Sequence, residues 1–107
     1  MKTIKWHRAC ALEDIDEDDV IRVDFHNQTF AVYRTKNNQF YATEGLCTHE
    51  GVHLSKGLLI GNIIECPMHQ GRFDIRNGAA KGAPVCIDLK TYQVKHKGEN
   101  LYIALPE

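Results

Sequence analysis

The chain has 107 residues, of which 43% are apolar and 25% are charged, and its formal net charge at pH 7 is −1. This length fits one domain with one modest core and leaves no room for a separate catalytic domain beside it. Because there is no basic excess, the composition argues against general binding to nucleic acids or to a membrane surface.

Neither end of the chain nor its interior carries a recognisable targeting or membrane segment. The start, MKTIKWHRACALEDID, has no apolar stretch followed by a small-residue cleavage site. The apolar run LLIGNII is short and is interrupted by Gly61 and Asn62, so it does not approach the length of a membrane span. We therefore expect a cytoplasmic protein. A reducing cytoplasm disfavours structural disulfides, which leaves the four cysteines as core residues, ligands or reactive thiols.

Short runs of β-branched and aromatic residues, separated by turn residues, predict strands along most of the chain. The segment ALEDIDEDDV allows one helical turn, and nothing longer is typical of a helix. VIRVDF (20–25) alternates, with Ile21, Val23 and Phe25 on its apolar side. The other predicted strands are residues 29–35, 39–44, 63–66, 72–75, 92–96 and 101–105.

Turn residues separate these strands at three places. Lys36-Asn37-Asn38 is typical of a hairpin turn, because asparagine tolerates positive φ. Asn77-Gly78 and residues 97–100 supply further turns. We therefore predict a small antiparallel all-β domain in which residues 45–71 are inserted as loops.

Two short pairs of metal-binding residue types lie within residues 47–69. Cys47 and His49 are separated by one residue, and Cys66 and His69 are separated by two. Each pair can place both side chains on one side of a tight loop, and several glycines and Pro67 surround them, as sharp ligand loops require. Two such loops facing each other could hold one compact metal site.

The order of the residue types distinguishes two metals. Zinc accepts two cysteines and two histidines, but its usual spacing pairs cysteine with cysteine and histidine with histidine. Both pairs here are mixed, which matches a 2Fe-2S cluster in which two histidines replace two cysteines on one iron. Cys47 and Cys66 would then hold one iron, and His49 and His69 the other. A zinc-binding interaction module stays as the alternative, and it predicts a colourless protein.

The stretches CTH (47–49) and CPMHQGRFD (66–74) resemble the two motifs of Rieske 2Fe-2S proteins. Nearly the whole chain is similar to the small Rieske ferredoxins that serve bacterial aromatic-ring-hydroxylating dioxygenases, including FYATEGLCTHEGVHLSKG, IIECPMHQGRFDIRNG, GAPVC and YQVKHKGENLYIAL. The resemblance implies a single Rieske ferredoxin domain over residues 1–107. It also implies a small antiparallel β-sandwich, the Rieske fold, whose two cluster-binding loops (about residues 45–71) lie at one tip.

The same resemblance implies an electron carrier rather than an enzyme. The chain would take single electrons from a flavin-dependent ferredoxin reductase fed by NAD(P)H and pass them to the Rieske centre of a terminal aromatic-ring dioxygenase. It would carry one 2Fe-2S cluster and act as a monomer, without nucleic acid or membrane partners. The alternative is the small Rieske-like subunit of a nitrite-reductase-type complex, but that subunit commonly lacks the complete set of ligands.

Four positions depart from the pattern of respiratory Rieske proteins. Those proteins form a disulfide over the cluster, whereas Val52 and Met68 occupy the matching positions here. They also carry a serine and a tyrosine that donate hydrogen bonds to sulfur, and here Gly71 and Phe73 stand in their place. Fewer donors to sulfur stabilise the reduced cluster less, so we predict a potential near the low end of the Rieske range, about −150 mV.

Other residues with reactive or charged side chains have simpler interpretations. His53 is expected to be a surface residue or a neighbour of the ligands rather than a ligand, and Cys10, Cys86 and Trp6 are expected to pack in the core. Gly82 and Pro84 would belong to a loop that shields the cluster, as the resemblance implies. The acidic run 13–19 holds six carboxylates and is interpreted as a solvated loop, with the steering of a basic partner as the alternative.

Overall fold

The structure is a computed structural model that describes residues 3–48, 51–67, 71–82 and 87–106. Three antiparallel sheets form the described part of the chain. The first sheet has the order β1 (Ile4–Ala11), β10 (Asn100–Pro106), β9 (Val94–Lys97). The second has the order β2 (Asp19–Phe25), β3 (Gln28–Arg34), β4 (Phe40–Glu44), β8 (Thr91–Tyr92). The third consists of β5 (Leu58–Ile60), β6 (Ile63–Glu65) and β7 (Arg72–Asp74).

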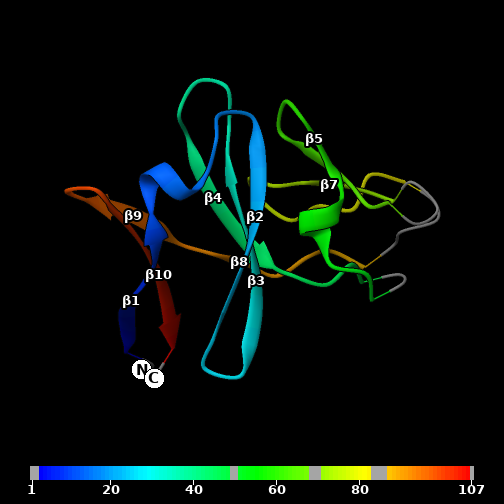
Figure 1. Cartoon of the computed structure of the whole chain (residues 1–107). Helices are drawn as coiled ribbons and strands as arrows, with labels where there is room; N and C mark the ends of the chain where they lie inside the picture. The colour runs from blue at the N-terminus through cyan, green and yellow to red at the C-terminus, as the bar shows by residue number, and fades with distance from the viewer. Residues whose placement is uncertain (1–2, 49–50, 68–70, 83–86, 107) are drawn as a thin grey trace.

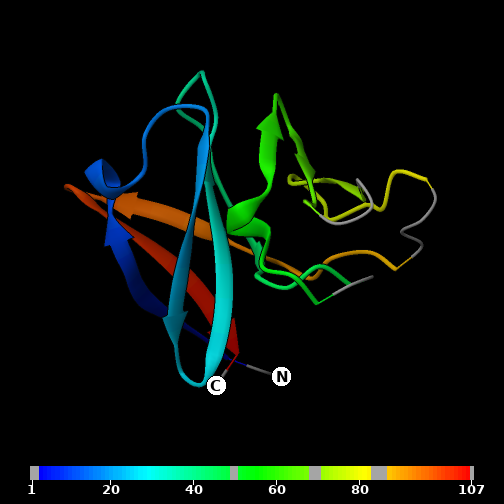
Figure 2. The same cartoon turned by 45° about the vertical axis from the view of Figure 1, so that its right-hand side comes forward.

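The four-stranded sheet is the middle layer of the molecule. Figure 1 shows the sheet of β1, β10 and β9 on one side of it and the small sheet of β5, β6 and β7 on the other. The view in Figure 2 has the same arrangement. Two 3-10 turns, η1 (Leu12–Asp14) and η2 (Leu54–Lys56), complete the described elements. The predicted all-β architecture is confirmed, and within the described residues no helix has the length and apolar character needed to cross a membrane.

Both faces of β3 are buried, which explains how the four-stranded sheet supports a core on each of its two sides. Phe30 and Val32 face a core shared with β10 and the end of β1, while Ala31 and Tyr33 face a second core under the small sheet. Alternate side chains of a strand point to opposite faces, so each core receives every second residue. Cys10 lies in the first core, as predicted, and burial raises the pKa of its thiol to about 11.

The predicted hairpin turn at residues 36–38 is present. Asn38 has a φ of 62°, and the Thr35 N–H donates to the Gln39 carbonyl at 2.8 Å. A second turn with positive φ at two residues, His26 and Asn27, joins β2 to β3 and was not predicted. Gly78 has a φ of 79°, and a β-carbon there would lie 2.0 Å from the Leu89 carbonyl oxygen, so this turn requires glycine.

The predicted strand at residues 92–96 is wrong as a single element. Thr91–Tyr92 pair with β4 in the middle sheet, whereas Val94–Lys97 pair with β10 in the first sheet. Between them, the Gln93 carbonyl accepts the Ala104 N–H at 3.0 Å. The chain changes sheets at this residue, and the periodicity of side chains does not reveal which partner strand each half selects.

Two further strands were not predicted. β1 mixes basic and apolar residues without alternation, and its register against β10 shifts between Arg8 and Cys10. A bulge of this kind interrupts the period-two pattern on which the prediction depends. β5 lies inside residues 45–71, which therefore hold η2 and two strands of the small sheet rather than loops alone.

Candidate metal centre

The first ligand loop follows β4 and is closed at its base by backbone pairing. Leu46 and His53 form an isolated antiparallel bridge, and the Cys47 N–H donates to the Val52 carbonyl at 2.8 Å. The Gly51 N–H in turn donates to the Cys47 carbonyl at 2.9 Å, with Gly51 at a φ of 70°. Cys47 therefore stands at the point where the loop leaves a fixed base.

The second ligand loop connects β6 to β7 and is closed in the same way. The Cys66 N–H donates to the Gly71 carbonyl at 2.6 Å, directly after the paired residues Glu65 and Arg72. The Arg72 guanidinium also donates to the Glu65 carboxylate at 2.9 Å across the two strands. In both loops the cysteine N–H binds the carbonyl five residues later, so each loop has the same span and the cysteine is its first residue.

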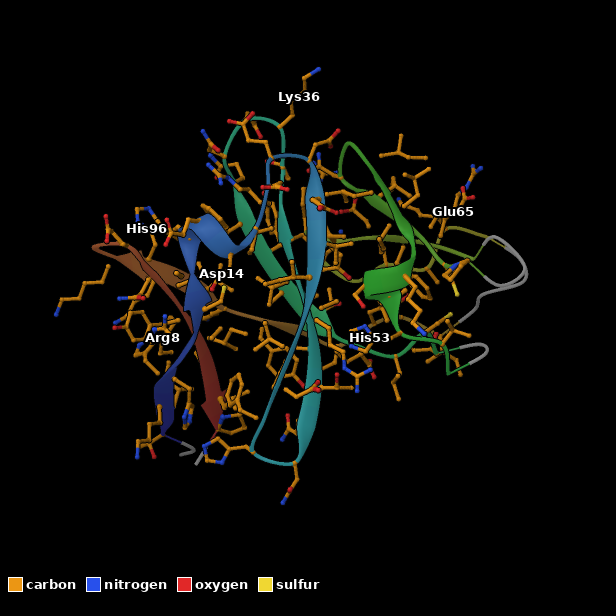
Figure 3. All side chains as sticks on the ribbon, in the orientation of Figure 1. Arg8, Asp14, Lys36, His53, Glu65 and His96 are labelled. Atoms are coloured by element: carbon orange, nitrogen blue, oxygen red, sulfur yellow. The ribbon has the colours of Figure 1, made fainter. Side chains whose placement is uncertain are left out.

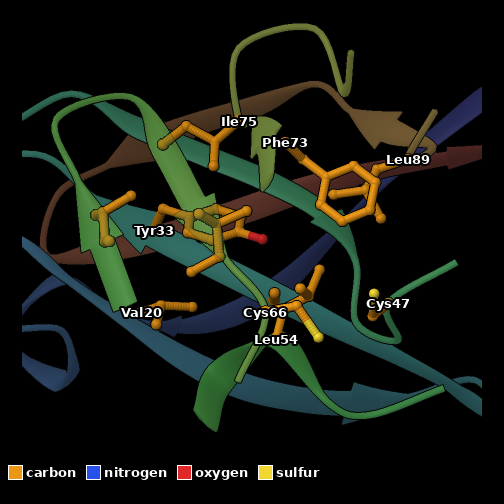
Figure 4. Close-up of a cluster of buried hydrophobic side chains, with 11 residues drawn as sticks. Val20, Tyr33, Cys47, Leu54, Cys66, Phe73, Ile75 and Leu89 are labelled. Carbon is orange, nitrogen blue, oxygen red and sulfur yellow. The ribbon is translucent and has the colours of Figure 1, made fainter. Parts of the chain in front are cut away.

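The two cysteine side chains are buried in one cluster beneath the small sheet. Cys47 is 3% exposed and Cys66 is fully buried, and both pack in the core that holds Leu54 and Phe73 (Figure 4). Two thiols held at neighbouring loop bases, shielded from water by apolar side chains, are suited to bind soft or borderline metal ions such as iron. The described donor set thus fits the cysteine half of a 2Fe-2S site.

The two histidines of the predicted ligand set lie outside the described residues. His49 belongs to residues 49–50 and His69 to residues 68–70, between the described halves of their loops. Within residues 3–48, 51–67, 71–82 and 87–106, no group of three potential metal ligands is found. The complete set of four therefore stays a prediction.

A third segment lies against the first ligand loop. The Thr48 hydroxyl donates to the Ile87 carbonyl at 2.8 Å, although the two residues are 39 positions apart. Leu46 and Ile87 are 43% and 61% exposed, so this junction presents two apolar side chains to solvent beside Cys47. Gly82 is exposed with a φ of 92°. Pro84 and Cys86, predicted for the shielding loop and for the core, lie outside the described residues.

The described positions that replace the respiratory hydrogen-bond donors are apolar and buried. Phe73 is fully buried in the core that also contains Cys66, and Gly71 is buried at the base of the second loop. Val52 packs against the same core, while Met68 lies outside the described residues. Neither Gly71 nor Phe73 carries a hydroxyl that could bind sulfur, which is the basis of the predicted low potential.

The acidic run lies far from the ligand loops. Figure 3 shows Asp14 at the end of the molecule that carries His96, with Glu65, the neighbour of Cys66, at the other end. All six carboxylates of residues 13–19 are exposed, and Ile15 alone is buried. This position agrees with a solvated loop and does not favour a steering patch at the ligand loops. Trp6, expected in the core, is only half-buried, with the Lys95 ammonium 4.3 Å above its ring.

The chain is similar to known proteins over most of its length. The model of the family described as Rieske [2Fe-2S] domain matches residues 5–93. The chain is 47% identical over 103 residues to the ferredoxin component of the naphthalene 1,2-dioxygenase system of Pseudomonas putida, with 96% of each chain covered.

Two solved structures have the same fold over nearly their full length. The ferredoxin of Sphingomonas yanoikuyae B1 matches with a TM-score of 0.88 and 35% identity, covering 95% of this chain and 100% of that chain. A chain in the complex of reduced oxygenase and oxidized ferredoxin in carbazole 1,9a-dioxygenase matches with a TM-score of 0.85 and 38% identity, covering 92% of each.

Proposed function

This chain belongs to the Rieske [2Fe-2S] domain family, and we propose that it is the electron-carrying ferredoxin of an aromatic-ring dioxygenase system. The observation that carries the proposal is the full-length identity of 47% to a ferredoxin component of such a system, with 96% of each chain covered. The chain is an electron carrier and not an enzyme, and its cofactor is one Rieske-type 2Fe-2S cluster. When bound, the cluster supplies one-electron transfer.

We assign the ligands as Cys47 and Cys66 on one iron and His49 and His69 on the other. The matching closure of the two loops supports this assignment, because it places both cysteines at equivalent positions on fixed backbone. Each histidine then follows its cysteine by two or three residues, toward the middle of its loop.

The partners in this proposal are a flavin-dependent ferredoxin reductase, using NAD(P)H, and a terminal oxygenase. The chain in the carbazole dioxygenase complex, which is similar to this one, comes from an assembly of oxygenase and ferredoxin. The exposed side chains of Leu46 and Ile87, beside the first ligand loop, offer an apolar contact surface suited to short-lived docking. The predicted potential of about −150 mV suits acceptance of electrons from a reduced flavin.

The proposal also includes the location of the protein in the cell, its oligomeric state and its domain organisation. We expect a cytoplasmic monomer formed by a single domain over residues 1–107, because a carrier that serves two proteins in turn must leave one docking surface open. The alternative of a fixed nitrite-reductase-type subunit is weakened by the complete Cys and His motif and by the full-length identity to ferredoxin components.

The proposal is tested by reconstituting electron transfer with purified proteins. The iron-loaded chain is mixed with the reductase and the oxygenase of the Pseudomonas putida naphthalene system, NADH and naphthalene, and product formation is measured. We expect product at catalytic amounts of the chain and none with its iron-free form. If the ferredoxin component of that system supports turnover and the iron-loaded chain does not, the assigned partner class is wrong.

A further inference from the structure

His53 is buried although it directly follows the first ligand loop. Its side chain is 4% exposed, so of the two positions considered from the sequence, at the surface or beside the ligands, the surface position is excluded. Both ring nitrogens have partners: Nδ1 accepts the Ser55 N–H at 3.0 Å, and Nε2 lies 2.8 Å from the Thr29 hydroxyl oxygen. The ring therefore joins the turn η2 on one side to strand β3 on the other.

The hydrogen bonds define the protonation state of this ring. Because Nδ1 accepts a backbone N–H, the ring proton lies on Nε2, which donates to the Thr29 hydroxyl. The Thr29 hydroxyl donates in turn to the Asp24 carboxylate at 2.5 Å, and Arg22 also donates to that carboxylate. Burial, Arg22 and Lys56 lower the pKa of His53 while Asp24 raises it, so the ring stays neutral at pH 7.

The same residue is attached to the backbone that leads into Cys47. His53 pairs with Leu46 in the bridge that closes the loop, and the next N–H, that of Leu54, donates to the Gly45 carbonyl at 2.7 Å. A β-carbon on Gly45 would lie 2.5 Å from the His53 Nε2 atom and 3.0 Å from the Thr29 carbonyl, so the ring rests directly against the glycine backbone. Gly45 also donates its N–H to the Thr29 carbonyl at 2.9 Å.

We propose that His53 is a positioning residue for the metal centre, which fixes the base of the first ligand loop by bridging Thr29 and η2 across Gly45. The inference rests on the proposed function, because it concerns the cluster that Cys47 binds. Without the ring, the Ser55 N–H loses its acceptor, the Thr29 hydroxyl keeps only the Asp24 carboxylate as a partner, and the Gly45 backbone loses the surface on which it rests. Cys47 would then become more accessible to water.

The test uses the iron-loaded protein and compares His53→Leu and Thr29→Val with Thr35→Val. His53→Leu removes both hydrogen bonds of the ring, and Thr29→Val removes only the bond on Nε2. Thr35→Val is the matched control, because Thr35 is also a hydrogen-bonded threonine and lies just beyond the other end of β3, at the turn 36–38. Iron release to a chelator, the midpoint potential and the paramagnetic resonance spectrum are measured for each protein.

We expect His53→Leu to release iron about tenfold faster, a change that corresponds to about 1.4 kcal/mol, because the Ser55 N–H is left without its acceptor and the Gly45 backbone without the ring against which it packs. His53→Leu and Thr29→Val should also raise the midpoint potential and alter the spectrum, because water near sulfur stabilises the more negative reduced state. In His53→Gln the amide nitrogen takes the place of Nε2, so this variant should have a rate of iron release and a midpoint potential between those of His53→Leu and the unmutated protein. Thr35→Val should leave iron release, potential and spectrum unchanged.

Each outcome decides the proposal. Unchanged potential and spectrum in His53→Leu and Thr29→Val would overturn it, as would equal changes in Thr35→Val, which would indicate a general loss of stability. If His53→Leu does not fold, the comparison of Thr29→Val with Thr35→Val gives the answer. Absence of a Rieske spectrum in the unmutated protein would instead contradict the proposed function, so the two failures are distinguishable.

Discussion

Replacing His49 and His69 together by cysteine is expected to lower the midpoint potential by about 250 mV. The substitution would convert mixed ligation into four thiolates. Plant-type 2Fe-2S proteins with four cysteines have potentials of about −400 mV, compared with about −150 mV at the low end of the Rieske range. Two more anionic ligands make addition of an electron less favourable. The measurement is a redox titration of both proteins, followed by paramagnetic resonance.

The control for this substitution is His96→Cys. His96 is exposed on β9, in the sheet farthest from the ligand loops, so a cysteine there should leave the potential and the spectrum unchanged. A double variant at residues 49 and 69 that keeps full iron content with the unmutated potential would show that these histidines are not ligands. The proposed Rieske-type ligation would then be incorrect.

Replacement of Cys66 by serine is expected to abolish cluster binding. Cys66 is fully buried at the base of the second loop, and a serine hydroxyl does not supply the thiolate that iron–sulfur clusters require. We expect the iron content to fall at least about tenfold, since a cluster with three protein ligands is open to water and to oxidation. Iron and acid-labile sulfide are measured after identical purification.

Cys10→Ala provides the matched control for Cys66→Ser. Cys10 is also buried, but it lies in the other core, away from Cys47 and Cys66, and burial raises the pKa of its thiol to about 11. Its removal leaves a small cavity in the core, so it should lower the free energy of unfolding and leave the iron content unchanged. Full iron retention in Cys66→Ser, or loss of iron in Cys10→Ala, would contradict the assignment of the cysteine ligands.

Features that depend on local chemistry could be predicted from the sequence. The alternation of Ile21, Val23 and Phe25 and the Lys36-Asn37-Asn38 turn correspond to β2 and to the β3–β4 hairpin. Cys47 and Cys66 were identified from their spacing, and the structure buries both in one cluster. In each case the relevant information lies within a few consecutive residues.

Features that depend on distant partners could not be predicted. The chain passes from one sheet to another at Gln93 because the residues before it pair with β4 and those after it pair with β10. Strand β1 forms by pairing with β10, with a bulge in its register. The sequence left His53 as a surface residue or a neighbour of the ligands, because one histidine in a loop gives no sign of burial. Its partner Thr29 is 24 positions away, so only the folded chain reveals the contact.

A redox titration of the purified, unmutated protein, monitored by paramagnetic resonance, tests the central claim most directly. The claim is that two mixed Cys and His pairs hold one two-iron cluster that carries single electrons at low potential. We predict a rhombic Rieske-type signal that appears on reduction at about −150 mV. The same signal at a clearly positive potential would contradict the assigned partners, and a colourless protein without iron would contradict the claim itself.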